Sequence, residues 1–147
     1  KLCVQFTTNQ MRLSRFRSHM FELKVKTRFA GAHQLTMVGQ KCENLHGHNW
    51  HVEVCVSGPK LNPAGVLADF GDIKKAVRKV VDGELDHKFL NELEAFQNSQ
   101  PTSERIALYI AENVQALLEK DMKEDVRVSR VMAWESDDAC AIYVPDF

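Results

Sequence analysis

Residues 21–29 alternate strictly between two kinds of side chain, and this alternation limits how the chain can fold. Every odd position carries Phe, Leu, Val or Thr, and every even position carries Glu, Lys or Arg. Side chains of a strand point alternately to its two faces, so the pattern predicts a half-buried β-strand. A second alternating run covers residues 48–57 and ends at Gly58-Pro59. We expect these two strands to pair antiparallel, with residues 30–41 as the loop between them.

Two helices and a closing hairpin are predicted after these strands. Asp69 is a capping residue for an apolar pattern of helical period that ends at Gly83. A second helix is expected from about residue 103 to 120, capped by Thr102 or Ser103. Residues 85–91 form a short irregular connection between the two helical segments. The runs 126–134 and 139–144 have strand patterns and predict a hairpin around residues 136–138.

The expected element order is therefore ββααββ, which is an α+β fold with an antiparallel sheet. Two helices can cover only one face of this sheet. Apolar residues such as Cys55, Ile142 and Val144 also occur on the other parity. Because an open sheet with exposed edges tends to find a partner, we expect a homo-oligomer, with a closed barrel as one arrangement.

Length and charge narrow the class of protein further. A chain of 147 residues that is 44% apolar suits one domain with its own core. We assign residues 21–147 to that domain, and the acid-free basic leader 1–20 to a cloning scar or upstream extension, with an organelle-targeting segment as the less favoured alternative. Acids outnumber bases after the leader, which argues against a nucleic-acid partner. Without an apolar run of membrane-spanning length, we expect a soluble, cytoplasmic protein with no membrane partner.

Residues 42–48, Cys-Glu-Asn-Leu-His-Gly-His, hold most of the candidate chemistry. His46 and His48 are two residues apart at a strand entrance, so their side chains share one face. His33 has the inward parity of the first strand, so the three imidazoles can converge unless a bulge near Gly31 intervenes. Three neutral imidazoles with an open fourth position describe a catalytic zinc site, whereas Cys42 as a fourth ligand would close a structural one. We favour the open site, because a core of this size does not need zinc to fold.

The four cysteines are far apart, and we expect all of them to be reduced thiols. Cys55 and Cys140 fall within predicted strands and are expected to be buried. Cys42 alone has chemical neighbours. If it is not a ligand, a nearby metal or imidazolium would favour its thiolate, which makes it a candidate nucleophile or general base.

Three further residues are candidates for the same chemistry. Asp86 and His87 are a carboxylate and an imidazole in an irregular connection, where functional residues concentrate. The alternative is that Asp86 caps a turn and His87 lies at the surface. Glu135 follows an apolar strand, where an unpaired carboxylate is costly. We expect it either in solvent at the hairpin or bound to a cationic or amide-rich ligand.

Six segments resemble, in order, the 6-pyruvoyltetrahydropterin synthase and 6-carboxytetrahydropterin synthase (QueD) family. They are residues 29–33, 42–48, 65–70, 85–91, 101–104 and 134–136. The resemblance implies the tunnelling fold, in which subunits assemble as a trimeric barrel and usually a hexamer, with active sites at subunit interfaces. One departure is Arg105, because Asn commonly follows the glutamate that corresponds to Glu104.

The resemblance also implies roles for the candidate residues. It implies a zinc ion on His33, His46 and His48. It implies proton transfer by Cys42, Asp86 and His87. It further implies contacts to the pterin ring by Glu135, helped by Thr102 and Ser103.

The substrate implied by the resemblance is 7,8-dihydroneopterin triphosphate, and the product depends on residues 42–46. The three-residue spacer between Cys42 and His46 resembles lyases that make 6-carboxy-5,6,7,8-tetrahydropterin for queuosine biosynthesis, whereas enzymes that make 6-pyruvoyltetrahydropterin usually have a longer spacer. Glu43 beside Cys42 resembles a bifunctional Cys-Glu subgroup that also yields 6-hydroxymethyl-7,8-dihydropterin for folate biosynthesis. The remaining alternatives are formation of 6-pyruvoyltetrahydropterin, Glu43 as a solvated loop carboxylate, and a non-catalytic structural zinc module.

Overall fold

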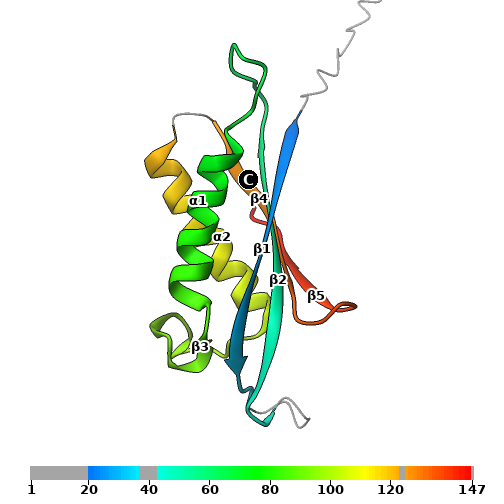
Figure 1. The fold of residues 1–147 in the computed structure, drawn as a ribbon, viewed down its shortest axis with the longest axis vertical. Helices are drawn as coiled ribbons and strands as arrows, with labels where there is room; N and C mark the ends of the chain where they lie inside the picture. The colour runs from blue at the N-terminus through cyan, green and yellow to red at the C-terminus, as the bar shows by residue number, and fades with distance from the viewer. Residues whose placement is uncertain (1–19, 37–42, 123–124, 147) are drawn as a thin grey trace, which may run out of the picture.

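The computed structural model describes residues 20–36, 43–122 and 125–146, which form one sheet and two long helices. The strands are β1 (Phe21–His33), β2 (His46–Gly58), β3 (Lys88–Phe89), β4 (Arg127–Trp134) and β5 (Cys140–Tyr143), and the helices are α1 (Phe70–Val80) and α2 (Ser103–Asp121). The shorter elements are the π-helical turn η2 (Val81–Leu85) and the 3₁₀ turns η3 (Leu90–Glu92) and η4 (Glu94–Phe96). The strand order in the sheet is β3-β1-β2-β4-β5. Both helices lie on the same side of this sheet (Figure 1).

The predicted α+β class and the order of the main elements are confirmed, with the short β3 as an addition. Only β3 pairs parallel, along β1, whereas the other described neighbours pair antiparallel. The prediction that residues 30–33 belong to a loop was wrong. Pairing of β1 with β2 continues without interruption from Phe21 opposite Gly58 to His33 opposite His46, so no bulge occurs at Gly31.

The helix starts agree with the predicted caps, but the end of the first helical segment differs. Asp69 Oδ1 accepts a hydrogen bond from Gly71 N at 2.5 Å, and Thr102 Oγ1 accepts one from Arg105 N at 3.3 Å. The first helix was expected to end at Gly83, but the chain continues through this residue in the π-helical turn η2. The wider turn places both Val81 and Leu85 in the core, where neither is exposed to solvent.

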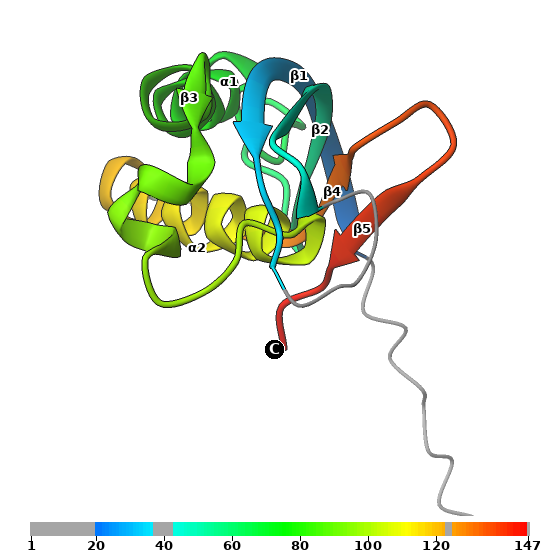
Figure 2. The same cartoon turned by 90° about the horizontal axis from the view of Figure 1, so that it is seen from below.

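The hydrophobic core lies between the helices and one face of the sheet. Both helices lie on that side of the sheet in the end-on view (Figure 2). Trp50 of β2 is fully buried and stacks on Phe29 of β1 with ring centroids 5.8 Å apart. The two helices supply Ile73, Val77, Val80, Ile106, Ile110 and Val114 to the same core. Trp50 follows the two histidines on β2, so the core extends to the candidate site.

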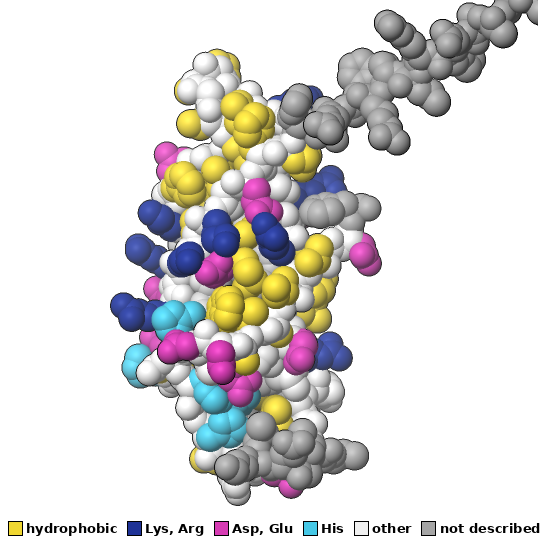
Figure 3. Space-filling view, turned by 90° about the vertical axis from the view of Figure 1, so that its right-hand side faces the viewer, with side chains coloured by type: hydrophobic (Ala, Val, Ile, Leu, Met, Phe, Trp, Pro, Cys, Tyr) yellow, Lys and Arg dark blue, Asp and Glu magenta, His cyan; other side chains and the backbone are white. Residues whose placement is uncertain are grey.

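The face of the sheet that the helices leave uncovered is partly apolar. It shows hydrophobic side chains beside charged ones (Figure 3). Ile142 and Val144 are each 58% exposed. Cys55 is fully buried as expected, whereas Cys140 is only half-buried because β5 is an edge strand with a neighbour on one side. Within the described ranges, no helix is long and apolar enough to cross a membrane.

Candidate metal centre

Three imidazoles meet where β1 ends and β2 begins. His33 lies directly opposite His46 in the strand pairing, and His48 is two residues further along β2 on the same face. The ring centroid of His33 is 4.5 Å from that of His46 and 5.3 Å from that of His48, and the latter two are 4.9 Å apart. The unbroken register of the two strands therefore brings together the three histidines whose parity predicted that they would converge.

Hydrogen bonds orient two of these rings and leave their Nε2 atoms available. His33 Nδ1 donates to Pro101 O at 2.8 Å, and His46 Nδ1 donates to Asn44 O at 2.6 Å. A carbonyl oxygen can only accept, so in the neutral ring Nδ1 carries the hydrogen and Nε2 carries a lone pair. Fixing the tautomer through Nδ1 in this way is common for imidazoles that bind metals through Nε2.

Two nitrogens in the cluster lack the partner that burial demands. Among the residues that the structure describes, neither His33 Nε2 nor His48 Nε2 has a hydrogen-bond partner, although both atoms are buried. A buried polar atom without a partner is costly and rare in folded proteins. The donor set therefore fits a metal ion bound to the Nε2 atoms.

Glu135, predicted as a pterin contact of the same site, also lies within ligand distance of the imidazoles, which was not predicted. Ligand atoms of His33, His46, His48 and Glu135 all lie within 4.8 Å of one another. Glu135 Oε1 is 3.1 Å from His48 Nε2, though not in the direction of a hydrogen bond, and Oε2 accepts a hydrogen bond from Ser103 Oγ at 2.6 Å. A signal was available, because Glu135 has the same parity as Ala133, whose side chain is buried in the core.

The surroundings of His48 favour its neutral form. Burial lowers the pKa of His48, and the neighbouring His33 and His46 lower it further, against the opposing effect of Glu135. Only a neutral imidazole has the lone pair that binds a metal. Trp50 packs edge-on against His33 and His48, with ring centroids 5.3 and 5.4 Å away, so the core supports two of the three rings.

Asp86 and His87 lie beside β1, directly after the turn η2. Asp86 Oδ1 accepts a hydrogen bond from Ala30 N at 2.9 Å, and Oδ2 lies 2.8 Å from His87 Nδ1. The hydrogen bond from Ala30, followed by the one from His87, lowers the pKa of Asp86. The side chain of His87 is 81% exposed. It borders a cavity of about 480 Å³ that His48 and Gly47 also line.

The remaining predicted site residues lie in different places. Cys42 lies outside the described residues, and its role stays a prediction. Glu43 is exposed, and its carbonyl oxygen accepts a hydrogen bond from Gln34 Nε2 at 2.8 Å. Thr102 uses its hydroxyl to cap α2, whereas Ser103 contacts Glu135.

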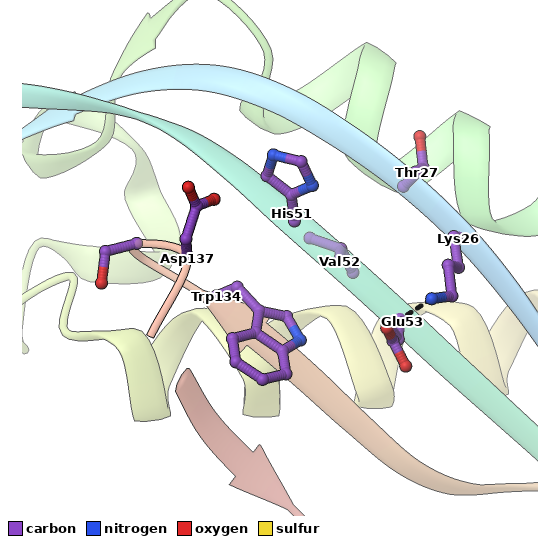
Figure 4. A pocket seen from close by; sticks show the side chains of 8 residues that line it. Lys26, Thr27, His51, Val52, Glu53, Trp134 and Asp137 are labelled. Atoms are coloured by element: carbon purple, nitrogen blue, oxygen red, sulfur yellow. Dashed lines mark ion pairs between the residues drawn. The ribbon is translucent and has the colours of Figure 1, made fainter. Parts of the chain in front are cut away.

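A second cavity, of about 200 Å³, opens on the other face of the sheet. It is lined by Lys26, Thr27, His51, Val52, Glu53, Trp134, Ser136 and Asp137 (Figure 4). His51 has the opposite parity to His48 on β2, so the sheet separates this cavity from the imidazole cluster. This cavity could not be predicted from the sequence, because its lining comes from three strands and the hairpin.

Comparison with known proteins identifies the family. The sequence model described as 6-pyruvoyl tetrahydropterin synthase matches residues 22–146. A putative 6-carboxy-5,6,7,8-tetrahydropterin synthase of Archaeoglobus fulgidus is 39% identical over 117 residues, covering 80% of this chain and 90% of that protein. Dihydroneopterin monophosphate aldolase of Pyrococcus furiosus is 36% identical over 110 residues, covering 75% of this chain and 85% of that protein.

A solved structure agrees with these sequence matches. The 6-pyruvoyl tetrahydropterin synthase of Caenorhabditis elegans superposes with a TM-score of 0.75 and 25% identity, over 89% of this chain and 99% of that one. The tunnelling fold expected from the sequence is thereby confirmed at the level of the subunit. With a family match that spans nearly the whole described chain, the protein belongs to the 6-pyruvoyl tetrahydropterin synthase family.

Proposed function

We propose that the protein is a zinc-dependent lyase that converts 7,8-dihydroneopterin triphosphate to 6-carboxy-5,6,7,8-tetrahydropterin. Family membership confirms the enzyme class, a lyase of the 6-pyruvoyltetrahydropterin synthase type. The specific product is supported by the name of the Archaeoglobus relative and by the three-residue spacer between Cys42 and His46.

The observation that carries the zinc proposal is that the Nε2 atoms of His33 and His48 are buried and make no hydrogen bond within the described residues. His46 completes a set of three nitrogens, which is a common ligand set of catalytic zinc. Zinc bound there would supply a Lewis acid that acidifies the side-chain hydroxyls of the substrate and the neighbouring C–H bonds.

The residues around the metal centre suit proton transfer. Asp86 is kept ionised by its lowered pKa and accepts the Nδ1 hydrogen of His87. In the neutral ring this tautomer carries its lone pair on Nε2. We assign to His87 the role of a general base or acid at the cavity that it shares with His48, and to Cys42 the second proton transfer. Triphosphate leaves during this reaction, and the other two carbons of the substrate side chain leave as acetaldehyde.

Glu135 is proposed to hold the pterin ring. A carboxylate matches the guanidine-like edge of a pterin, which presents two parallel N–H donors. Ser103 orients this carboxylate through its 2.6 Å hydrogen bond, and Thr102 fixes the start of α2 beside it. Glu135→Gln tests the role, because a pterin contact predicts a raised KM with metal retained. Loss of the metal together with turnover would instead make Glu135 a ligand.

We further propose that the active enzyme is a homo-oligomer, a trimeric barrel or a hexamer built from two of them. The uncovered face of the sheet and its edge strand β5 expose Ile142 and Val144, which a second subunit would cover. His87 is exposed at the rim of its cavity, as expected for a residue that completes a site at a subunit interface. Sedimentation velocity measures this state, and a stable monomer that retains full turnover would contradict it.

A second product is favoured by one feature of the chain. Glu43 stands beside Cys42, and the Pyrococcus relative is named an aldolase that acts on dihydroneopterin monophosphate. Cleavage of the substrate side chain to 6-hydroxymethyl-7,8-dihydropterin is therefore the alternative activity.

Incubation of the zinc-loaded protein with 7,8-dihydroneopterin triphosphate, followed by mass analysis of the products, tests these proposals together. We expect the carboxy product, with hydroxymethyl product as a minor component that Glu43→Gln suppresses selectively. Cys42→Ala should retain zinc and lose turnover. Joint loss of zinc and stability in Cys42→Ala would favour a structural zinc module, and absence of any pterin product from the wild type would refute the lyase.

A further inference from the structure

Two side-chain amides extend the hydrogen bonding of β1 beyond its last residue. Asn91 Oδ1 accepts from Gln34 N at 2.9 Å, and Asn91 Nδ2 donates to Gln34 O at 2.7 Å. Gln100 repeats the arrangement at Thr36, since its Oε1 accepts from Thr36 N and its Nε2 donates to Thr36 O at 2.8 Å. Each amide therefore satisfies both peptide groups of one residue.

The local fold explains why side chains, and not a neighbouring strand, hydrogen-bond to the backbone of Gln34 and Thr36. β3 pairs with β1 only at residues 31 and 32, and the chain then turns into η3. The backbone of β3 no longer pairs with residues 34–36. Unpaired peptide groups are costly at the part-buried Gln34, whereas Thr36 is exposed. A side-chain amide carries one acceptor and one donor group, as a peptide does, so it can replace the missing strand.

The residues held in this way lie between two parts of the candidate site. His33 precedes Gln34, and its Nδ1 is held by the carbonyl of Pro101, the residue after Gln100. On the other side, Gln34 Nε2 donates to Glu43 O at 2.8 Å. The segment 34–36 thus connects the imidazole that is fully buried in the metal centre with the backbone of Glu43.

We propose that Asn91 and Gln100 are positioning residues for the metal centre. They hold the segment 34–36 against residues 91–101. This keeps His33 in contact with Pro101 O and its ligand nitrogen within 4.8 Å of the other ligand atoms. The inference rests on the proposed function, in which the three imidazoles bind the metal. Groups that orient a metal ligand typically affect metal affinity and turnover without touching the ion.

Asn91→Leu and Gln100→Met replace the amides by apolar side chains of similar shape and length, and Asn113→Leu is the matched control. Asn113 is a half-buried amide that donates to Tyr109 O within α2, away from residues 34–36. Co²⁺ is used as the probe metal, because its visible absorption spectrum reports ligand geometry without substrate. Each of the two variants should bind Co²⁺ about tenfold more weakly and with a changed spectrum. With zinc, kcat should fall about 10- to 100-fold, with a smaller change in KM. The control should match the wild type in all three readouts.

Asn91→Asp covers the case in which the apolar variants do not fold. It keeps the acceptor for Gln34 N but places a carboxylate oxygen against Gln34 O, so Co²⁺ affinity should again fall. The positioning role would be overturned if folded Asn91→Asp, or the folded apolar variants, matched the wild type in Co²⁺ spectrum, Co²⁺ affinity and kcat. A wild type that binds Co²⁺ without forming pterin product would overturn the proposed function alone, whereas one that binds no Co²⁺ would overturn both.

Discussion

Replacing His87 by glycine should stabilise the fold while removing activity. His87 has a φ of 56°, and it is the only non-glycine residue in the described part of the chain with positive φ. Its backbone N donates to Ala30 O at 2.7 Å, which a glycine can also do. Strained backbone of this kind often occurs at functional sites, where the side chain is needed for chemistry.

The expected gain follows from three contributions. A left-handed conformation costs a residue with a Cβ about 1–2 kcal/mol, which glycine avoids. The substitution also costs about 0.5–1 kcal/mol, because glycine makes the unfolded chain more flexible. The ion pair between His87 and Asp86 adds little, since the imidazole is 81% exposed and screened by water. The free energy of unfolding of His87→Gly should therefore rise by about 0.5–1 kcal/mol.

Urea denaturation measures this gain, provided that the slope of the free energy of unfolding against urea concentration is unchanged. Product formation measures the loss of activity. Under the proposed function, kcat should fall about 10²- to 10⁴-fold, as for the loss of a general acid or base. The matched stability control is Gly65→Ala. Gly65 has a φ of 79° and open space around the position of a Cβ, so the substitution should destabilise through backbone strain alone. A His87→Gly variant less stable than wild type would refute the strain argument, and retained turnover would refute the catalytic role.

Three further predictions concern stability. Thr102→Ala should lower the free energy of unfolding by about 1 kcal/mol, since Arg105 N loses its acceptor, and an unchanged urea midpoint would contradict the cap. Burial and the hydrogen bond to Glu84 raise the pKa of Tyr109 to about 12, above its ordinary 10.0. The contribution of Tyr109 to the free energy of unfolding is therefore complete below pH 10 and is lost as the pH rises towards 12. Tyr109→Phe should therefore lose less stability than the wild type between pH 10 and 12. Identical profiles of stability against pH for the two proteins would contradict this role of Tyr109. Hydrogen bonds from Lys24 and Lys26 lower the pKa of Glu53 from its ordinary value of 4.5. The contribution of Glu53 to the free energy of unfolding is therefore present above pH 4.5 and is lost as the pH falls below it. Denaturation at descending pH should show a smaller acid loss for Glu53→Gln, and equal slopes would argue against this contribution.

The sequence by itself determined the fold class and the convergence of three histidines. Alternation with period two reports which face of a strand each residue takes, and it places His33, His46 and His48 on one face. Cap residues such as Asp69 and Thr102 report where helices begin, because their hydrogen bonds are local. Both patterns can be read from the sequence, because they depend only on residues that are neighbours in the chain.

Tertiary structure alone decided which further residues join the three histidines and what holds the imidazoles in place. Strand pairing carries β1 to His33, and the closing hairpin brings Glu135 to the same cluster. The carbonyl that orients His33 and the amides that hold residues 34–36 come from residues 91–101, far away in the sequence. Such contacts depend on strand register and on the path of loops. No local periodicity records them, because they form only when the helices pack onto the sheet.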